Sequence, residues 1–170
     1  MRRLFVALAA ALTLAACATA QKLGAASDVH ALLVAIRDND SQTFDAHVDH
    51  EALKAQLHGF LEKQLAGNKQ LKGLAGLLGQ SGLVDFADEA LVQPKTFRLV
   101  AEQYGYKPDT KIPNAVVIAQ ALKQLPDGRV CATKGKDGPC MLIFAKEQGV
   151  WKLTAFQGDF SMLRIKLGRL

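Results

Sequence analysis

Apolar residues near residue 30 recur with the period of a helix. Ser27 can serve as an N-cap, and apolar side chains follow at i, i+3, i+4 and i+7, namely Val29, Leu32, Leu33 and Ile36. This spacing predicts an amphipathic helix that begins after Ser27. The polar run at residues 38–40 is expected to end it.

Two further helices are predicted before residue 68. Asp40 or Ser41 can cap a short helix that carries Phe44, His47 and Val48 on one face. Asp49 can cap a longer helix. Its apolar stripe consists of Leu53, Leu57, Phe60, Leu61 and Leu65. The pair at residues 67–68, glycine and asparagine, is expected to end it.

Glycine interrupts the next apolar segment, residues 71–83, at every third position. Each interior glycine costs a helix about 1 kcal/mol relative to alanine, so we expect a weak or broken helix. Close packing between helices and a movable apolar flap over a cavity or lipid surface both remain open. Residues 83–92 have a helical pattern again.

A fourth clear helix is expected from Pro94, a residue that suits the first helical position. Gly105 follows it, and residues 106–113 form a linker. Residues 116–125 favour a helix with a strand as the alternative, and the Pro-Asp-Gly turn at residues 126–128 ends that element.

The pattern changes to a period of two after residue 129. The expected strands are 129–134, 140–146 and 150–156, with 160–167 as a further candidate. Trp151, Leu153 and Ala155 alternate with polar residues, so one face should be buried, and residues 146–149 form a hairpin turn. Helices followed by antiparallel strands define an α+β fold, with N-terminal helices packed on a curled sheet of three to four strands.

A short apolar run, residues 4–16, follows two arginines at the start of the chain. A helix that crosses a bilayer needs about 20 apolar residues, so a removed signal peptide at residues 1–16 fits better than a membrane span. Leu14-Ala15-Ala16-Cys17 resembles a lipobox, in which Cys17 is acylated and becomes the new N-terminus. Residues 17–27 are then a lipidated tether, and residues 28–170 a single domain with a helical part, 28–105, and a mainly β part, 112–170.

The membrane is therefore an expected partner through this lipid anchor. Ala18 stands where inner-membrane lipoproteins of this kind carry Asp, so the resemblance implies the outer membrane, facing the periplasm. The alternative is cleavage after the A-x-A pattern at residues 18–20, which would release a soluble protein.

Charge and size limit the class of protein further. Two of the 21 basic residues lie in the expected signal, so 19 remain against 16 acidic residues, and 154 of the 170 residues remain for one domain. No arginine-rich stripe alternates with aromatic residues. Nucleic acid is therefore not an expected partner.

Two cysteines remain if Cys17 carries lipid. Cys131 and Cys140 flank a segment with two glycines, an aspartate and a proline. Folding this segment about Gly135 brings the cysteines opposite each other, and in an oxidising envelope they should form a disulfide. The loop is short, so the bond should contribute about 2.5–3 kcal/mol on the chain-entropy model. A metal or redox pair is disfavoured by the spacing and by the lack of a nearby histidine.

The densest titratable cluster lies at residues 47–51. His47 and His50 are weak candidates for a zinc site, since Asp49 is better used as a cap and no third ligand is evident. Asp85 and Glu89 lie one helical turn apart, which suits acid–base work but also a solvated face. No recognised catalytic motif is present, so we expect neither an enzyme nor a cofactor.

Several of these segments together resemble a known family. They are residues 31–37, Asp40, Phe44, residues 47–49 and 53–57, and a closing stretch at residues 142–153. In these segments the chain resembles a bacterial envelope family catalogued as domain of unknown function 2939. The resemblance implies placement in the envelope and a fold, and it supplies no catalytic residues.

The leading hypothesis is a binding or structural module that holds an apolar ligand, such as a lipid, or a partner protein between helices and sheet. The alternatives are a metal-assisted hydrolase that uses His47 and His50, and an inhibitor of an envelope enzyme.

Overall fold

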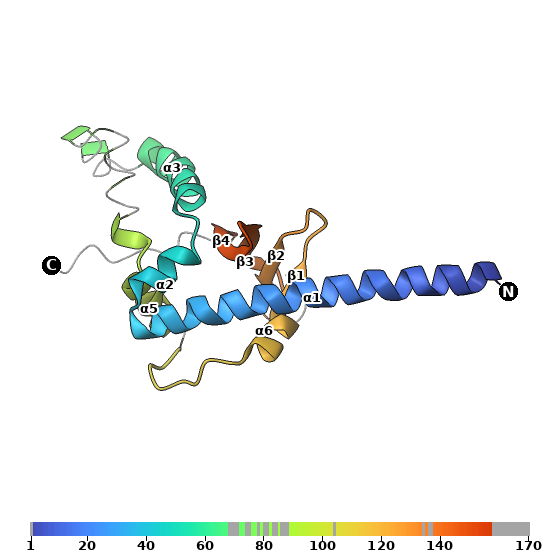
Figure 1. Ribbon diagram of the computed structural model, residues 1–170. Coiled ribbons are helices and arrows are strands. Elements are labelled where there is room, and N and C mark those ends of the chain that lie inside the picture. Colours follow the sequence, from blue (N-terminus) through green and yellow to red (C-terminus); the bar gives the residue numbers. More distant parts are fainter. Residues whose placement is uncertain are drawn as a thin grey trace.

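The computed structural model confirms the α+β order of elements (Figure 1). It describes residues 2–67, 72–73, 76–77, 79, 82, 85, 89–103, 105–133, 135 and 138–157. The helices are α1 (Arg2–Asp38), α2 (Ser41–Ala46), α3 (His50–Gly67), α5 (Pro94–Gln103) and α6 (Ala115–Ala121). The strands are β1 (Leu122–Gln124), β2 (Val130–Thr133), β3 (Cys140–Glu147) and β4 (Val150–Phe156). The candidate strand at 160–167 and most of the glycine-interrupted segment at 71–83 lie outside the described residues.

The four strands form one open antiparallel sheet in the order β1-β2-β3-β4. The β3–β4 hairpin turns at Gln148 and Gly149, whose φ angles are 49° and 93°. Two successive positive φ angles match the right-handed twist of the flanking strands. The hairpin predicted at residues 146–149 is therefore confirmed.

The ambiguous stretch at 116–125 contains both alternatives in succession. The Asn114 side chain accepts a hydrogen bond from the Val117 backbone N–H (3.0 Å), which caps α6. At Leu122 the backbone becomes extended, and β1 pairs with β2. The described sheet therefore contains the three strands predicted from residue 129 onward and one more, β1, which precedes them in the chain.

The predicted start of the first helix is wrong. Ser27 lies inside α1, which runs without a break through the expected tether at residues 17–27. Alanine is the best helix former, and residues 15–26 are rich in it. Ala25 and Ala26 are both 0% exposed, so the end of the expected tether belongs to the core.

The first helix packs along the sheet and contacts α2, α5 and α6 as well (Figure 1). The predicted apolar stripe is confirmed, since Val29 and Leu32 are buried and Leu33 and Ile36 pack against the core. The caps predicted at Asp40 and Asp49 are confirmed too, because each carboxylate accepts a backbone N–H three residues further on. At Asp40 the hydrogen bonds from Thr43 lower the pKa of the carboxyl.

The α2–α3 junction is joined to the edge of the sheet. Val48 forms an isolated parallel bridge with Leu153 on β4. The Leu153 N–H donates to the carbonyl of His47 (2.9 Å), and its carbonyl accepts from the Asp49 N–H (3.0 Å). A three-residue segment thus acts as a further strand beside β4.

A bulge changes the predicted alternation on β4. Ile143 pairs with Ala155 while Phe144 pairs with Leu153, so Thr154 is an extra residue. Trp151 and Leu153 are buried as predicted. Beyond the bulge Phe156, and not Ala155, packs against the core cluster, because one inserted residue reverses the faces that follow it.

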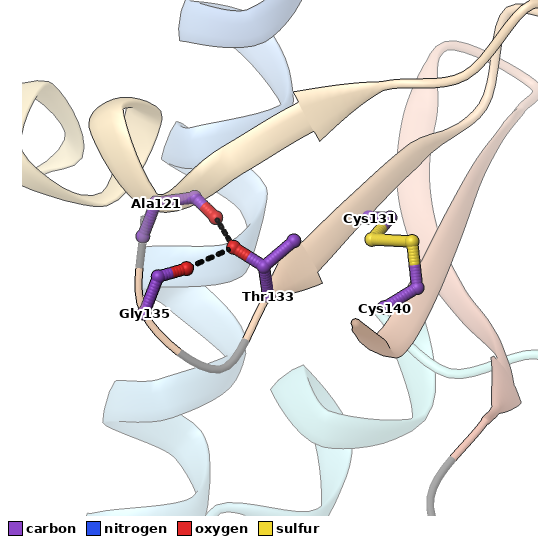
Figure 2. The surroundings of a disulfide bond; sticks show 5 residues. All are labelled: Ala121, Cys131, Thr133, Gly135 and Cys140. Atoms are coloured by element: carbon purple, nitrogen blue, oxygen red, sulfur yellow. Dashed lines mark hydrogen bonds between the residues drawn. A yellow bond between two sulfur atoms is a disulfide. The ribbon is translucent and has the colours of Figure 1, made fainter. Parts of the chain in front are cut away.

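The predicted disulfide between Cys131 and Cys140 is present, with a Cα–Cα distance of 5.6 Å (Figure 2). The two residues are not direct cross-strand partners. Cys131 pairs with Ile143, and Cys140 pairs with Thr133 after a register shift. The bond therefore joins β2 and β3 diagonally.

Candidate functional site

The candidate site is an apolar cavity of about 260 Å³ between α1, α6 and the sheet. Hydrocarbon side chains line it throughout. They are Val29, Leu32, Leu33 and Ile36 of α1, Phe97 of α5, Pro113, Val117, Ile118 and Ala121 in and before α6, and Leu122, Ala132, Leu142, Phe144 and Leu153 of the sheet.

The amphipathic stripe of α1 forms one wall of this cavity. The same i, i+3, i+4, i+7 spacing that predicts the helix places its apolar side chains against the sheet. Opposite this wall, α6 and β2 contribute the small residues Ala121 and Ala132. Small side chains at these two positions leave space that larger ones would fill.

The cavity has a buried floor and a wetter rim. Phe144 and Leu153 are 1% and 0% exposed, whereas Val117 is 50% exposed. Phe97 is fixed between two other rings, with centroid distances of 5.2 Å to Phe44 and 5.6 Å to Phe156. The rim at Val117 of α6 is therefore open to solvent.

The lining determines what chemistry the cavity can do. Among the described residues, the lining includes no titratable or nucleophilic side chain that could act as acid, base or nucleophile. An apolar cavity of roughly 150 Å³ can hold benzene, and pockets for drug-sized ligands begin near 300 Å³. The cavity therefore suits a short stretch of hydrocarbon.

The two histidines proposed as metal ligands have separate partners. His47 Nδ1 lies 2.8 Å from the Thr43 carbonyl oxygen, and its Nε2 lies 3.8 Å from Asp28 Oδ1. His50 Nε2 lies 3.0 Å from Asp45 Oδ1. Within the described ranges, no group of three or more His, Cys, Asp or Glu side chains is placed to hold a metal ion.

The two carboxylates considered for acid–base chemistry, Asp85 and Glu89, have different surroundings. Asp85 forms an ion pair with Lys54 of α3. Glu89 is exposed. The two carboxylates thus resemble a solvated face more than an acid–base pair.

The side chain of Cys17, the expected lipidation site, lies outside the described residues, although α1 passes through this position. In the part of the chain that the structure describes, no helix combines the length and the apolar character needed to span a bilayer.

Sequence reasoning missed the contribution of α6 and of residues 132 and 142 to the cavity. Their sequence signal was the apolar pattern at 115–122, which indicated an element but not its neighbours. Pairing of α6 with α1 depends on tertiary contacts between residues about 90 positions apart, and local periodicity does not contain this information.

The fold and cavity define an α+β protein with an apolar site beneath its first helix. The sequence profile described as "Protein of unknown function (DUF2939)" matches residues 10–100, and the chain belongs to this family. The matched range covers α1 to α5 in part or whole and ends before the sheet, so the likeness at residues 142–153 is not part of it. Neither a curated protein nor a solved structure matches the chain.

Proposed function

We propose that this protein is a lipid-anchored binding module of the bacterial cell envelope that holds a hydrocarbon ligand between α1, α6 and the sheet. The cavity of about 260 Å³ with a wholly apolar lining carries the proposal. Binding would bury hydrocarbon without leaving a polar group of the wall unpaired, and each buried CH₂ contributes about 0.8 kcal/mol.

The envelope placement has two supports. The first is the pattern of two arginines, an apolar run and Leu14-Ala15-Ala16-Cys17. The second is the disulfide, since such bonds persist in oxidising compartments and are rare in the cytosol. In this proposal acyl chains on Cys17 hold the protein on the outer membrane, facing the periplasm.

A metal-assisted hydrolase has weaker support. His47 and His50 are each engaged with a different carboxylate, and a third ligand is missing among the described residues. We therefore propose a non-enzymatic role.

The experiment for the cavity compares two variants of the full chain. Lipids are extracted from natively purified protein and quantified by mass spectrometry. Ala132→Leu should fill part of the cavity and lower the bound hydrocarbon at least several-fold. The matched control, Ala46→Leu, adds the same atoms at an exposed position of α2 and should leave it unchanged. Wild-type protein that carries no hydrocarbon, and whose melting temperature does not rise with added decanol, would refute the binding role.

The anchor is tested separately by intact-mass measurement of the protein from native membranes. We expect a chain that begins at residue 17 and carries acyl groups. A chain that begins at Gln21 without lipid would exclude the anchor while leaving the cavity proposal intact.

A further inference from the structure

We infer that the cavity takes a single-chain lipid whose anionic head group is held by Arg98 and Tyr106 at the C-terminal end of α1. This inference names the ligand class of the proposed site and therefore rests on the proposed function.

The cavity ends beside a basic side chain. Its α1 wall runs from Val29 to Ile36, a rise of about 10 Å. Phe97 of α5 is also part of the lining, and its ring packs on Phe44 of α2, the helix that follows α1. The residue after Phe97 is Arg98, and its Nη1 donates to the carbonyl of Arg37, the residue after Ile36, at 3.4 Å. The Arg98 guanidinium therefore lies where the apolar wall stops.

Two polar atoms in this region are buried without a hydrogen-bond partner. They are Arg98 Nε and the Tyr106 hydroxyl, and they are the two such side-chain atoms in the described part of the chain. A buried polar group without a hydrogen bond costs about 1–3 kcal/mol, and native proteins seldom keep one without a reason. Anionic ligand oxygens that accept from these two donors would supply that reason.

Tyr106 belongs to the same end of α1. Its backbone N–H donates to the Ala101 carbonyl (3.0 Å), which turns the chain back after α5. The side-chain hydrogen bond to Asp38 raises the pKa of Arg37, and charge interactions with Asp38 and Tyr106 add to this rise. Tyr106 therefore lies near Arg37, at the C-terminal end of α1.

The nearby carboxylates leave Arg98 partly available. Arg37 is held by Asp38 through two short contacts of 2.7 and 2.8 Å. Glu102 Oε1 lies 3.6 Å from Arg98 Nε, which is an ion pair but too long for a hydrogen bond. The Arg98 side chain is also 34% exposed, so its fork can turn toward an entering group.

The donors decide the kind of head group. Arginine and tyrosine hydroxyl both donate, and a guanidinium fork matches the oxygens of a carboxylate or phosphate. A cationic head group would meet the like charge of Arg98 and Arg37 and would have to compete with them for Glu102 and Asp38. A chain in the cavity with its anionic oxygens on Arg98 and Tyr106 satisfies both parts of the site.

The test measures thermal unfolding of the full chain in amphipol with decanoate, decanol or decyltrimethylammonium, because a ligand that binds the native state raises the melting temperature. Decanoate should bind at least 10-fold more tightly than decanol, and the cationic lipid most weakly. Arg98→Gln should lower decanoate affinity to that of decanol while decanol binding stays unchanged. Arg129→Gln, which removes an exposed arginine of the β1–β2 turn, is the matched control.

A second variant keeps the test decisive if Arg98→Gln does not fold. Tyr106→Phe removes one hydroxyl and should weaken decanoate several-fold, with no effect on decanol. Glu102→Gln removes the competing carboxylate and should strengthen decanoate binding. Equal binding of decanoate and decanol to the wild type overturns the head-group inference alone, whereas absence of binding by all three lipids overturns the proposed function as well.

Discussion

Individual side chains complete the outer edge of β4. The Asp28 carboxylate accepts from the Trp151 N–H at 2.8 Å, and the Gln56 amide both donates to and accepts from the backbone of Phe156. An uncovered strand edge is a template for association with other chains, and these two residues cover it together with the segment at 47–49. The caps at helix starts are predictable from sequence because they are local. These pairs are not, because their partners lie 123 and 100 positions away.

Gln56→Ala should destabilise the protein. The change removes the two part-buried hydrogen bonds that the Gln56 amide makes with the N–H and the carbonyl of Phe156, at a cost of about 1–3 kcal/mol. Urea unfolding followed by circular dichroism measures the loss. Gln42→Ala, at an exposed position of α2, should change stability by less than about 0.5 kcal/mol. Equal effects of the two substitutions would show that Gln56 does not act on the strand edge.

Gly24→Ala should stabilise the protein although the residue faces β4. An added Cβ would meet Trp151 Nε1 at 3.7 Å, an ordinary contact distance. Alanine in a helix interior gains about 1 kcal/mol over glycine. The same substitution at Gly149 should be destabilising, because its φ of 93° is unfavourable for a side chain. A lower melting temperature for Gly24→Ala would mean that α1 has no room to accept a methyl group.

Elements differ in how well the sequence determines them. Hydrophobic periodicity and turn residues predict most of them. These are the helices before residue 67, the helix after Pro94 and three of the strands. The prediction that the first helix begins after Ser27 was wrong. The alanine-rich run before Ser27 favours helix more strongly than Ser27 favours a helix start. The bulge at Thr154 was not predictable, since it depends on the register between two strands.

The disulfide joins β2 and β3, so its removal should lower the stability of the sheet. Cys131→Ala combined with Cys140→Ala should cost about 2–4 kcal/mol of unfolding free energy. Urea midpoints with and without a reducing agent give the comparison. Reductant should shift the wild type toward the double variant and leave the variant unaffected. A wild type insensitive to complete reduction would show that the sheet holds its register without the bond.

At the scale of the whole molecule, the order of helices and strands predicts the fold class but not the placement of the cavity. The cavity combines α1, α5, α6 and all four strands. Its position depends on how α6, a seven-residue helix, lies against α1. A sequence pattern states which side of each element is apolar, and it does not state which neighbours leave a gap between them.

The extent of the folded unit can be tested by truncation. A chain that begins at Gln21 should keep full stability, whereas one that begins at Ser27 loses Ala25 and Ala26 from the core. Two buried methyl groups correspond to about 1.5 kcal/mol, and the hydrogen bonds of Gln21 to Gly128 and Gln124 are lost in addition. Urea unfolding of both chains provides the measurement. Identical midpoints would restore Ser27 as the start of the domain.

The contact between Asp28 and Trp151 links the earliest packed helix with the last strand of the described sheet, 123 positions later. A chain emerging from a ribosome or a translocation channel can form the α1 helix early, but that helix lacks its contact with β4 until residues 150–156 have been delivered. Contacts of such long sequence separation form slowly, so the part of α1 that packs on β4 stays uncovered during the interval. The protein can therefore complete its fold only after nearly all of its described length has been released.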